Sequence, residues 1–175
     1  KAFELDVRAC HENGITSFHD AGIPKKTIAL YDKMKTEGKM KTRIYAMLTG
    51  WDKELLSEWY VKGPFVDPDH LVTIRSVKLN CDGALGSRGA WLLESYTDRP
   101  DHFGHETLPM EFVKETALNG LNNGFQVCAH AIGDRANREI LDRYELAFNE
   151  LPDLASNHRF RIEHAQHLHP EDIPR

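Results

Sequence analysis

Hydrophobic residues recur along this chain in two alternating patterns, one typical of strands and one typical of helices. Strand-like runs are expected at Ile15–His19, Arg43–Thr49, Val72–Asn80, Phe125–Ala131 and Phe160–Gln166. Helical spacing of apolar residues is expected over Lys1–Asn13, Lys25–Thr36, Asp52–Val61, Pro109–Asn122 and Arg135–Asn149. Because strands and helices alternate at intervals of roughly thirty residues, the pattern predicts βαβ units and a parallel sheet.

Two of the expected strands have one apolar and one polar face, although a parallel sheet covered by helices is normally apolar on both. The polar positions are Lys78, Asn80 and Asp82 in one strand and Gln126, Cys128 and His130 in the other. An open doubly wound sheet would bury these groups under a helix, at a desolvation cost unless each found a partner. In a closed barrel they would line the interior below the active-site mouth. The pattern therefore favours an α/β fold of the (β/α)8 TIM-barrel type.

The segment Gly83–Leu108 separates an expected strand from an expected helix and has no clear period. It contains Gly, Pro, Asp and His residues instead of a regular apolar pattern. In a compact domain a loop of this length is more often an active-site or binding loop than a simple connection. We therefore expect this segment to contribute to a functional site.

Composition narrows the class of protein. The net charge of −5 and the hydrophobic fraction of 41% over 175 residues suit one domain with a buried core. No Lys or Arg run forms a basic stripe and no apolar run is long enough to cross a bilayer, which argues against nucleic-acid and membrane partners. Cys10, Cys81 and Cys128 lack Cys-x-x-Cys spacing, which indicates free thiols in a reducing compartment. A cytoplasmic location is expected unless an upstream signal directs the protein elsewhere.

The two ends of the chain both fall within expected helices. The chain begins at Lys1 rather than Met, and His169–Asp172 has the pattern of a helix start close to the last residue. We therefore expect residues 1–175 to be an internal part of a longer barrel, truncated at both ends, with no second domain in this stretch.

Two histidines end expected strands and precede helical or turn-like sequence, His130 and His164. The C-terminal ends of barrel strands converge on one face, so the two imidazoles could approach a single ion. Neutral imidazole is a common zinc ligand, and three protein ligands plus water leave an open catalytic position. Either histidine alone would more often be an isolated core or surface residue. As a pair at equivalent positions they predict a metal site.

Lys78 lies on the polar face of a central expected strand, where a lysine is rarely left buried and unpaired. Two interpretations remain open. A desolvated lysine has a lowered pKa, and its neutral amine can react with carbon dioxide or a carbonyl group. Alternatively, Lys78 forms a salt bridge with Asp82 or with an acidic residue elsewhere in the barrel.

Three further residues have supporting roles in this hypothesis. Asp134 follows Gly133 just before a helical run, so N-capping is its expected role, with a second contact to the ring of His130 as the alternative. Gly86 and Arg88 follow the Lys78 strand, and we expect them to contact substrate, with Arg88 holding a carboxylate. The alternative for this pair is a tight turn with a surface arginine.

Glu163 adjoins His164 in the sequence but should not share its ion. Alternation along a strand points neighbouring side chains to opposite faces. We expect Glu163 to form an ion pair with Arg161 underneath the covering helices.

Three longer motifs, taken together, resemble the amidohydrolase superfamily, and within it the YtcJ-like group known as amidohydrolase family 3. They are Val77–Arg88 (VKLNCDGALGSR), His130–Asn137 (HAIGDRAN) and Arg161–Gln166 (RIEHAQ). The resemblance extends over nearly the whole chain, and the motifs occur in the order of the family. They are specific for the family and say little about the substrate.

The resemblance implies a distorted (β/α)8 barrel, of which this chain would supply strands two to six with their helices. It implies that His130 is the strand-five ligand and His164 the strand-six ligand of a divalent metal, with zinc the expected element and one or two ions per site. Lys78 matches the strand-four position, where many relatives carry a carboxylated lysine that bridges two metals.

The chain also departs from the family pattern. Relatives have a His-x-His pair after strand one and a strand-eight Asp that acts as general base and ligand. The His-x-His pair is not found, since His11 and His19 lack that spacing. The strand-eight Asp is not found either, since strands two to six are all that this chain is expected to supply. Two histidines and one lysine do not complete a metal site, so we expect no hydrolytic activity from residues 1–175 alone.

The resemblance implies hydrolysis of an amide, a cyclic amide or a related C–N bond in a small-molecule substrate, by water that a metal activates. A related esterase or deaminase is one alternative, and a non-catalytic barrel that binds a small ligand is another. A homo-oligomer is compatible with either.

Overall fold

The computed structural model describes residues 2–175. They form two compact units, one that extends to Val77 and one from Lys78 to Arg175, and the boundary between them falls inside one strand, β4. Within residues 2–175 no helix combines the length and the apolar character that crossing a bilayer requires.

The first unit alternates helices with mainly parallel strands. Its elements are α1 (Ala2–Glu12), β1 (Ser17–Ile23), α2 (Lys25–Thr36), β2 (Arg43–Thr49), α3 (Lys53–Lys62), β3 (Phe65–Val66) and the first part of β4 (Val72–Asn80). Strand β1 pairs in parallel with β2, β2 lies beside β4, and the short β3 pairs antiparallel to β4. Parallel neighbours joined through helices are the βαβ arrangement that the sequence predicts.

Helix α3 illustrates how local sequence sets the ends of an element. The carboxylate of Asp52 accepts a hydrogen bond from the backbone N–H of Leu55 at 2.9 Å, which caps the first turn. The helix ends at Gly63, whose φ of 80° few other residues adopt without strain. Between these two residues Leu56 and Trp59 are buried on the inner face.

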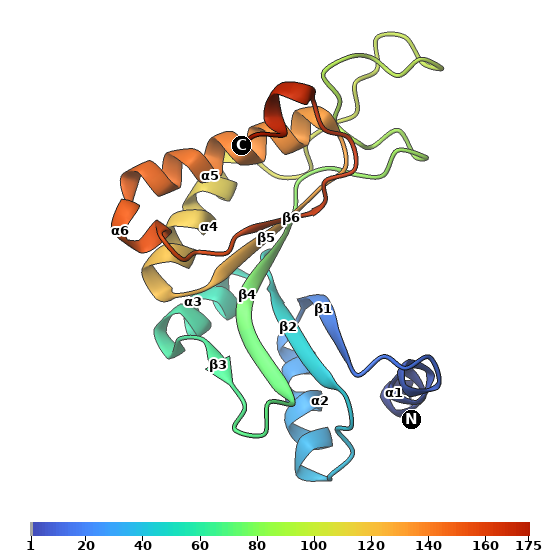
Figure 1. Ribbon diagram of the computed structural model, residues 1–175, viewed down its shortest axis with the longest axis vertical. Helices are drawn as coiled ribbons and strands as arrows, with labels where there is room; N and C mark the ends of the chain where they lie inside the picture. The colour runs from blue at the N-terminus through green and yellow to red at the C-terminus, as the bar shows by residue number, and fades with distance from the viewer. Residues whose placement is uncertain (1) are drawn as a thin grey trace. The chain divides into compact units, whose positions relative to one another are not determined.

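The second unit contains the candidate site. It comprises the end of β4, α4 (Met110–Asn123), β5 (Gln126–Ala131), α5 (Asp134–Glu150), α6 (Pro152–Ala155), β6 (Arg161–His164) and the 3-10 helix η1 (Pro170–Asp172). Strand β5 lies between β4 and β6 and runs parallel to β6. Helices α4 and α5 pack against each other and against β5 (Figure 1). Their apolar stripes are buried at Val113, Ala117, Ile140, Tyr144 and Ala147.

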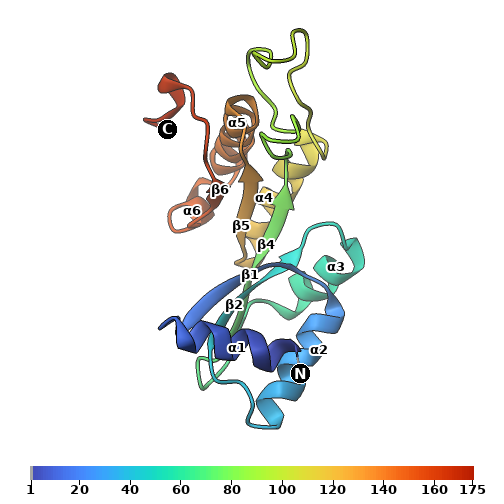
Figure 2. The ribbon, with the colours of Figure 1, turned by 90° about the vertical axis from the view of Figure 1, so that its right-hand side faces the viewer.

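The segment between β4 and α4 contains no helix or strand, as the sequence predicts, and extends beyond the C-terminal ends of β4 and β5 (Figure 2). It nevertheless has packing of its own, because Ala90 and Tyr96 are buried together with Ile132. The hydroxyl of Tyr96 donates to the carbonyl of Ala90 at 2.9 Å. The segment is therefore a folded part of the second unit.

The α/β class is confirmed, with parallel strands and covering helices as in part of a (β/α)8 barrel. The expected bounds of α2, β2 and β4 match the structure to the residue. The first expected strand was placed too early, since β1 is Ser17–Ile23, and the last was too long, since β6 ends at His164. Whether residues 1–175 belong to a single barrel domain stays a prediction.

Candidate active site

The two histidines singled out by the sequence lie next to each other at the C-terminal ends of β5 and β6. Their ring centroids are 4.5 Å apart, and the rings meet edge to face at 75°. The register of the parallel pair places His164 of β6 opposite Ala131 of β5, one residue beyond the position that faces His130. The sequence-based expectation that His130 and His164 approach each other is therefore confirmed.

The backbone of β6 turns out of the extended conformation at His164. His164 has φ of 74° and Ala165 has φ of 43°, values that residues other than glycine and asparagine rarely adopt. Strand alternation therefore stops at this point, and the exposed imidazole of His164 reaches the ring of His130. Burial, followed by the charge of His130, lowers the pKa of His164, which favours the neutral imidazole that binds metals.

The expected ion pair of Glu163 with Arg161 is present, with Nη2 of Arg161 2.6 Å from Oε1 of Glu163. Its expected position under the helices is wrong. Glu163 lies in register with His130, so the two residues belong to the same polar face of the sheet. The expectation failed because it extended regular alternation through His164, where the positive φ ends it.

Lys78 is buried, with 7% of its surface exposed, on the last part of β4. Its ammonium group donates to the carbonyl of Leu79 at 2.8 Å and contacts Oδ1 of Asn80 at 3.4 Å. Burial lowers the pKa of Lys78, and the negative charge of Glu163 opposes that shift. Among residues 2–175 no carboxylate pairs with Lys78 within ion-pair distance, so the suggested salt bridge with Asp82 is not formed.

Asp82 contacts His130 instead, a contact that the sequence analysis did not anticipate. Its side chain is fully buried, and Oδ1 lies 3.2 Å from Nε2 of His130. Oδ1 also accepts from the backbone N–H of Ile132 at 3.0 Å. Oδ2 accepts from the N–H of Gly133 at 2.8 Å and from the N–H of Trp91 at 3.0 Å.

These contacts keep the Asp82 carboxylate ionised. Burial by itself would raise the pKa of Asp82. The contact with His130 and the hydrogen bonds from the backbone of Gly133, Trp91 and Ile132 outweigh burial, so the pKa is lowered overall. A buried negative charge with this many donors is consistent with a fixed position of the side chain.

Asp134 is not the N-cap of α5. Gly133 occupies the N-cap position, and Oδ1 of Asp134 accepts from the backbone N–H groups of Leu93 and Arg135, each at 2.9 Å. Asp134 therefore attaches the 83–108 segment to the start of α5. The carboxylate that contacts His130 is Asp82.

The loop residues expected to contact substrate have different environments. Arg88 forms a two-pronged ion pair with Asp98, with Nη2 to Oδ2 at 2.7 Å and Nε to Oδ1 at 3.2 Å. A Cβ atom added at Gly86 would meet nothing within 4 Å, so this position faces open space. Asp98 occupies the fork of Arg88 that would hold a substrate carboxylate, whereas Gly86 leaves room beside the strand end. A substrate role for both stays a prediction.

The donor set fits a metal only in part. Two imidazoles meet at one point, which suits a shared ion, whereas Nε2 of His130 is buried against the carboxylate of Asp82. Within residues 2–175, however, no three His, Cys, Asp or Glu side chains converge as a complete set of ligands. His130, His164 and Lys78 would therefore hold an ion together with donors from elsewhere.

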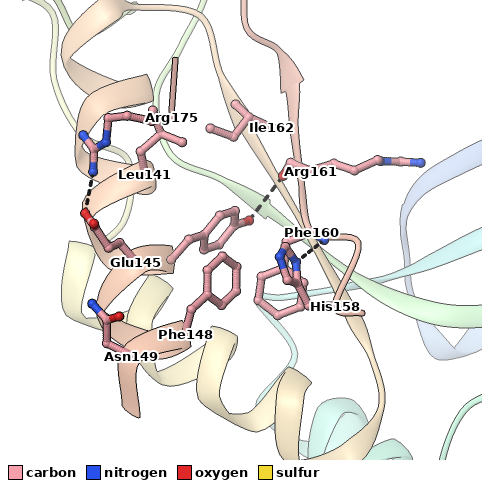
Figure 3. Close-up of a pocket in the computed structure, with 10 residues that line it drawn as sticks. Leu141, Glu145, Phe148, Asn149, His158, Phe160, Arg161, Ile162 and Arg175 are labelled. Carbon is pink, nitrogen blue, oxygen red and sulfur yellow. Dashed lines mark hydrogen bonds and ion pairs between the residues drawn. The ribbon is translucent and has the colours of Figure 1, made fainter. Parts of the chain in front are cut away.

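A separate cavity of about 470 Å³ lies against α5 and does not include these residues (Figure 3). Aromatic rings dominate it, with His158 stacked on Phe148 at 4.0 Å and Phe160 meeting Tyr144 at 5.1 Å. The side chain of Arg161 points away from this cavity, toward the other side of β6 (Figure 3). None of the candidate ligands lines it, so we assign the chemistry to the strand ends despite the size of this cavity.

Known proteins similar to this chain are longer. Protein LONG AFTER FAR-RED 3 of Arabidopsis thaliana is 35% identical over 152 residues, which cover 82% of this chain and 24% of that protein. The putative amidohydrolase YtcJ of Bacillus subtilis (strain 168) is 28% identical, with 100% of this chain and 32% of that protein covered. This chain therefore spans about a quarter to a third of the length of these relatives.

Two crystal structures share the fold. An uncharacterized metal-dependent hydrolase from Pyrococcus furiosus superposes with a TM-score of 0.83 and 29% identity, over 96% of this chain and 33% of that one. A second such hydrolase, from Pyrococcus horikoshii OT3, gives a TM-score of 0.75 and 25% identity, over 89% of this chain and 34% of that one. The sequence model of the amidohydrolase family matches residues 1–175 in full, and this chain belongs to the amidohydrolase family.

Proposed function

We propose that the protein containing this chain is a metal-dependent hydrolase that cleaves amide or other C–N bonds of a small-molecule substrate. The observation that carries the proposal is the 4.5 Å approach of the His130 and His164 rings at neighbouring strand ends, in a chain of the amidohydrolase family. The similarity to two metal-dependent hydrolases supports the need for a divalent ion, for which zinc is our choice.

The residues of this chain would act on such an ion by binding and orienting it. His130 and His164 would donate ring-nitrogen lone pairs, and the lowered pKa of His164 favours its neutral ring. Lys78 would be the third donor as a carbamate, formed when its neutral buried amine bonds to the carbon of carbon dioxide and releases a proton to solvent. When bound, a divalent ion polarises a carbonyl group and lowers the pKa of a water molecule toward about 7.

Metal analysis of the full-length protein tests the proposal. We expect one or two equivalents of metal after purification with zinc supplied, and loss of at least one equivalent in His130→Ala and His164→Ala. His105→Ala is the matched control, because His105 lies exposed in the 83–108 segment and should leave the metal content unchanged. A wild-type protein that stays free of metal under these conditions would contradict the proposal.

A substrate panel separates the chemical alternatives. We expect hydrolysis of amides and cyclic amides to exceed that of matched esters, and both to need the metal. Ester hydrolysis or release of ammonia from an amino group as the main reaction would assign the protein to the related esterases or deaminases. Binding of a small ligand without turnover would indicate a non-catalytic barrel.

A further inference from the structure

We infer that Asp82 is a positioning residue, whose carboxylate holds His130 in one tautomer and anchors the 83–108 segment beside it. The inference rests on the proposed function, since orienting His130 matters most if His130 binds a metal. Neither the family pattern stated above nor the comparisons assign a role to this residue. Its role follows from four contacts made by two oxygen atoms.

The two carboxylate oxygens of Asp82 face four donors. Oδ1 faces the backbone N–H of Ile132 and the ring of His130, and Oδ2 faces the N–H groups of Gly133 and Trp91. A carboxylate can accept at both oxygens, whereas an asparagine accepts at one and donates at the other. In an asparagine at this position, the side-chain NH2 group would therefore face N–H donors that now bind a carboxylate oxygen.

The ring of His130 has one buried nitrogen next to Asp82. Its Nε2 atom lies 3.2 Å from a fully buried carboxylate oxygen, and no better-aligned acceptor among residues 2–175 replaces that contact. A ring nitrogen this close to a negative oxygen is far more stable with a hydrogen than with a lone pair. Asp82 therefore selects the tautomer with hydrogen on Nε2, which leaves the lone pair of Nδ1 to bind a metal.

The 83–108 segment is attached to the same carboxylate through Trp91. Trp91 donates its N–H to Asp82, and its carbonyl accepts from the N–H of Ala136 at 3.2 Å in the first turn of α5. The contact is so close that a Cβ atom on Gly133 would lie 2.0 Å from the carbonyl oxygen of Trp91. The residue that orients His130 thus also anchors the segment, so removing the carboxylate of Asp82 should affect both the ring and the segment.

The experiment uses full-length protein with ¹⁵N-labelled histidine, freed of metal and held at a pH where the His130 ring is neutral. We expect the wild-type ring to carry its hydrogen on Nε2. Asp82→Asn should convert it to a mixture of tautomers and, after metal is restored, weaken metal binding by about 10- to 100-fold. Hydrogen exchange at the amides of Trp91 and Gly133 should become faster in the same variant.

Two variants separate positioning from a general loosening of the segment. Asp98→Asn removes an exposed carboxylate of the same segment that pairs with Arg88, and Tyr96→Phe removes the hydroxyl that donates to Ala90. Both leave Asp82 in place, so the His130 tautomer and the metal affinity should match the wild type.

Several results would overturn the inference. A wild-type His130 ring with its hydrogen on Nδ1 would do so without any variant, even if Asp82→Asn fails to fold. An Asp82→Asn variant with an unchanged His130 tautomer and unchanged metal affinity would also contradict the inference. So would a Tyr96→Phe variant that loses as much metal affinity as Asp82→Asn. If the full-length protein binds metal and gives any of these results, only the positioning role of Asp82 is contradicted. If the full-length protein binds no metal, the proposed function itself is contradicted.

Discussion

The two strand ends that carry the candidate ligands differ in how firmly the folded chain holds them. At the end of β5 the ring of His130 is partly buried and lies against the fully buried carboxylate of Asp82. At the end of β6 the ring of His164 is exposed, makes no hydrogen bond with any of residues 2–175, and sits on a backbone with φ of 74°. One ligand is therefore oriented by packing, and the other by an unfavourable backbone conformation, as is common at functional sites.

The largest effect on stability is expected from a substitution that disrupts the packing at the end of β5. In Gly133→Ala the new Cβ atom would lie 2.0 Å from the backbone oxygen of Trp91, which has no flexible end to move away. We expect the free energy of unfolding to fall by about 3 kcal/mol, as for an overpacked core position. Chemical denaturation of the full-length protein measures it.

Gly86→Ala is the matched control, because nothing lies within 4 Å of the added atom. We expect a change of no more than about 0.5 kcal/mol for this variant. Equal stability of the two variants would show that the contact between Trp91 and Gly133 is not as close as described.

The backbone strain at the end of β6 is tested by comparing two substitutions of His164. Both His164→Gly and His164→Ala remove the imidazole, but only glycine adopts φ of 74° without a steric penalty. We expect the glycine variant to be more stable than the alanine variant by about 1 kcal/mol. Denaturation midpoints give the difference, and an alanine variant that is equally stable would mean that β6 ends without strain.

A smaller effect is expected from the residue that joins the two strands. The buried hydroxyl of Tyr144 on α5 lies 3.4 Å from the carbonyl of Val127 in β5 and 3.3 Å from the carbonyl of Arg161 in β6. Because both hydrogen bonds are long, Tyr144→Phe should lower the free energy of unfolding by only about 0.5 kcal/mol. Hydrogen exchange should rise in both strands, and a change confined to one of them would contradict the bridging role.

The smallest effect concerns the approach to β6. Burial lowers the pKa of His158, which stacks on Phe148 and accepts a hydrogen bond at Nδ1 from the N–H of Phe160 at 2.7 Å. The neutral ring therefore stabilises the fold above its unfolded pKa of about 6.5, and this contribution is lost as the pH falls through that value toward the lower folded pKa.

We expect the wild type to lose stability relative to His158→Phe between pH 7 and pH 5, by less than about 0.5 kcal/mol. The phenylalanine keeps an aromatic ring against Phe148 and does not titrate. Glu145, Arg161 and Arg175, which line the same cavity, add their own charges, so the difference between the two proteins is the quantity to measure. A difference that does not change with pH would show that His158 titrates normally.

The local sequence was sufficient to predict those helices and strands whose apolar pattern lies entirely within the element. The apolar spacing of Lys25–Thr36 and the runs at Arg43–Thr49 and Val72–Asn80 gave α2, β2 and β4 with their observed bounds. The end of β6 was misjudged because the backbone turns to a positive φ at His164, which the apolar pattern of Phe160–Gln166 does not signal. The same error placed Glu163 on the wrong face.

The sequence by itself determined the α/β class, the amidohydrolase family and the pair of strand-end histidines, because strand periodicity and motif order are properties of neighbouring residues. Only the tertiary structure decided that Asp82 contacts His130 instead of Lys78, and that Asp134 holds Leu93 instead of capping α5. The physical reason is separation along the chain. Asp82 meets donors at Trp91, Ile132 and Gly133, and that convergence exists only after β4, β5 and the 83–108 segment have folded together.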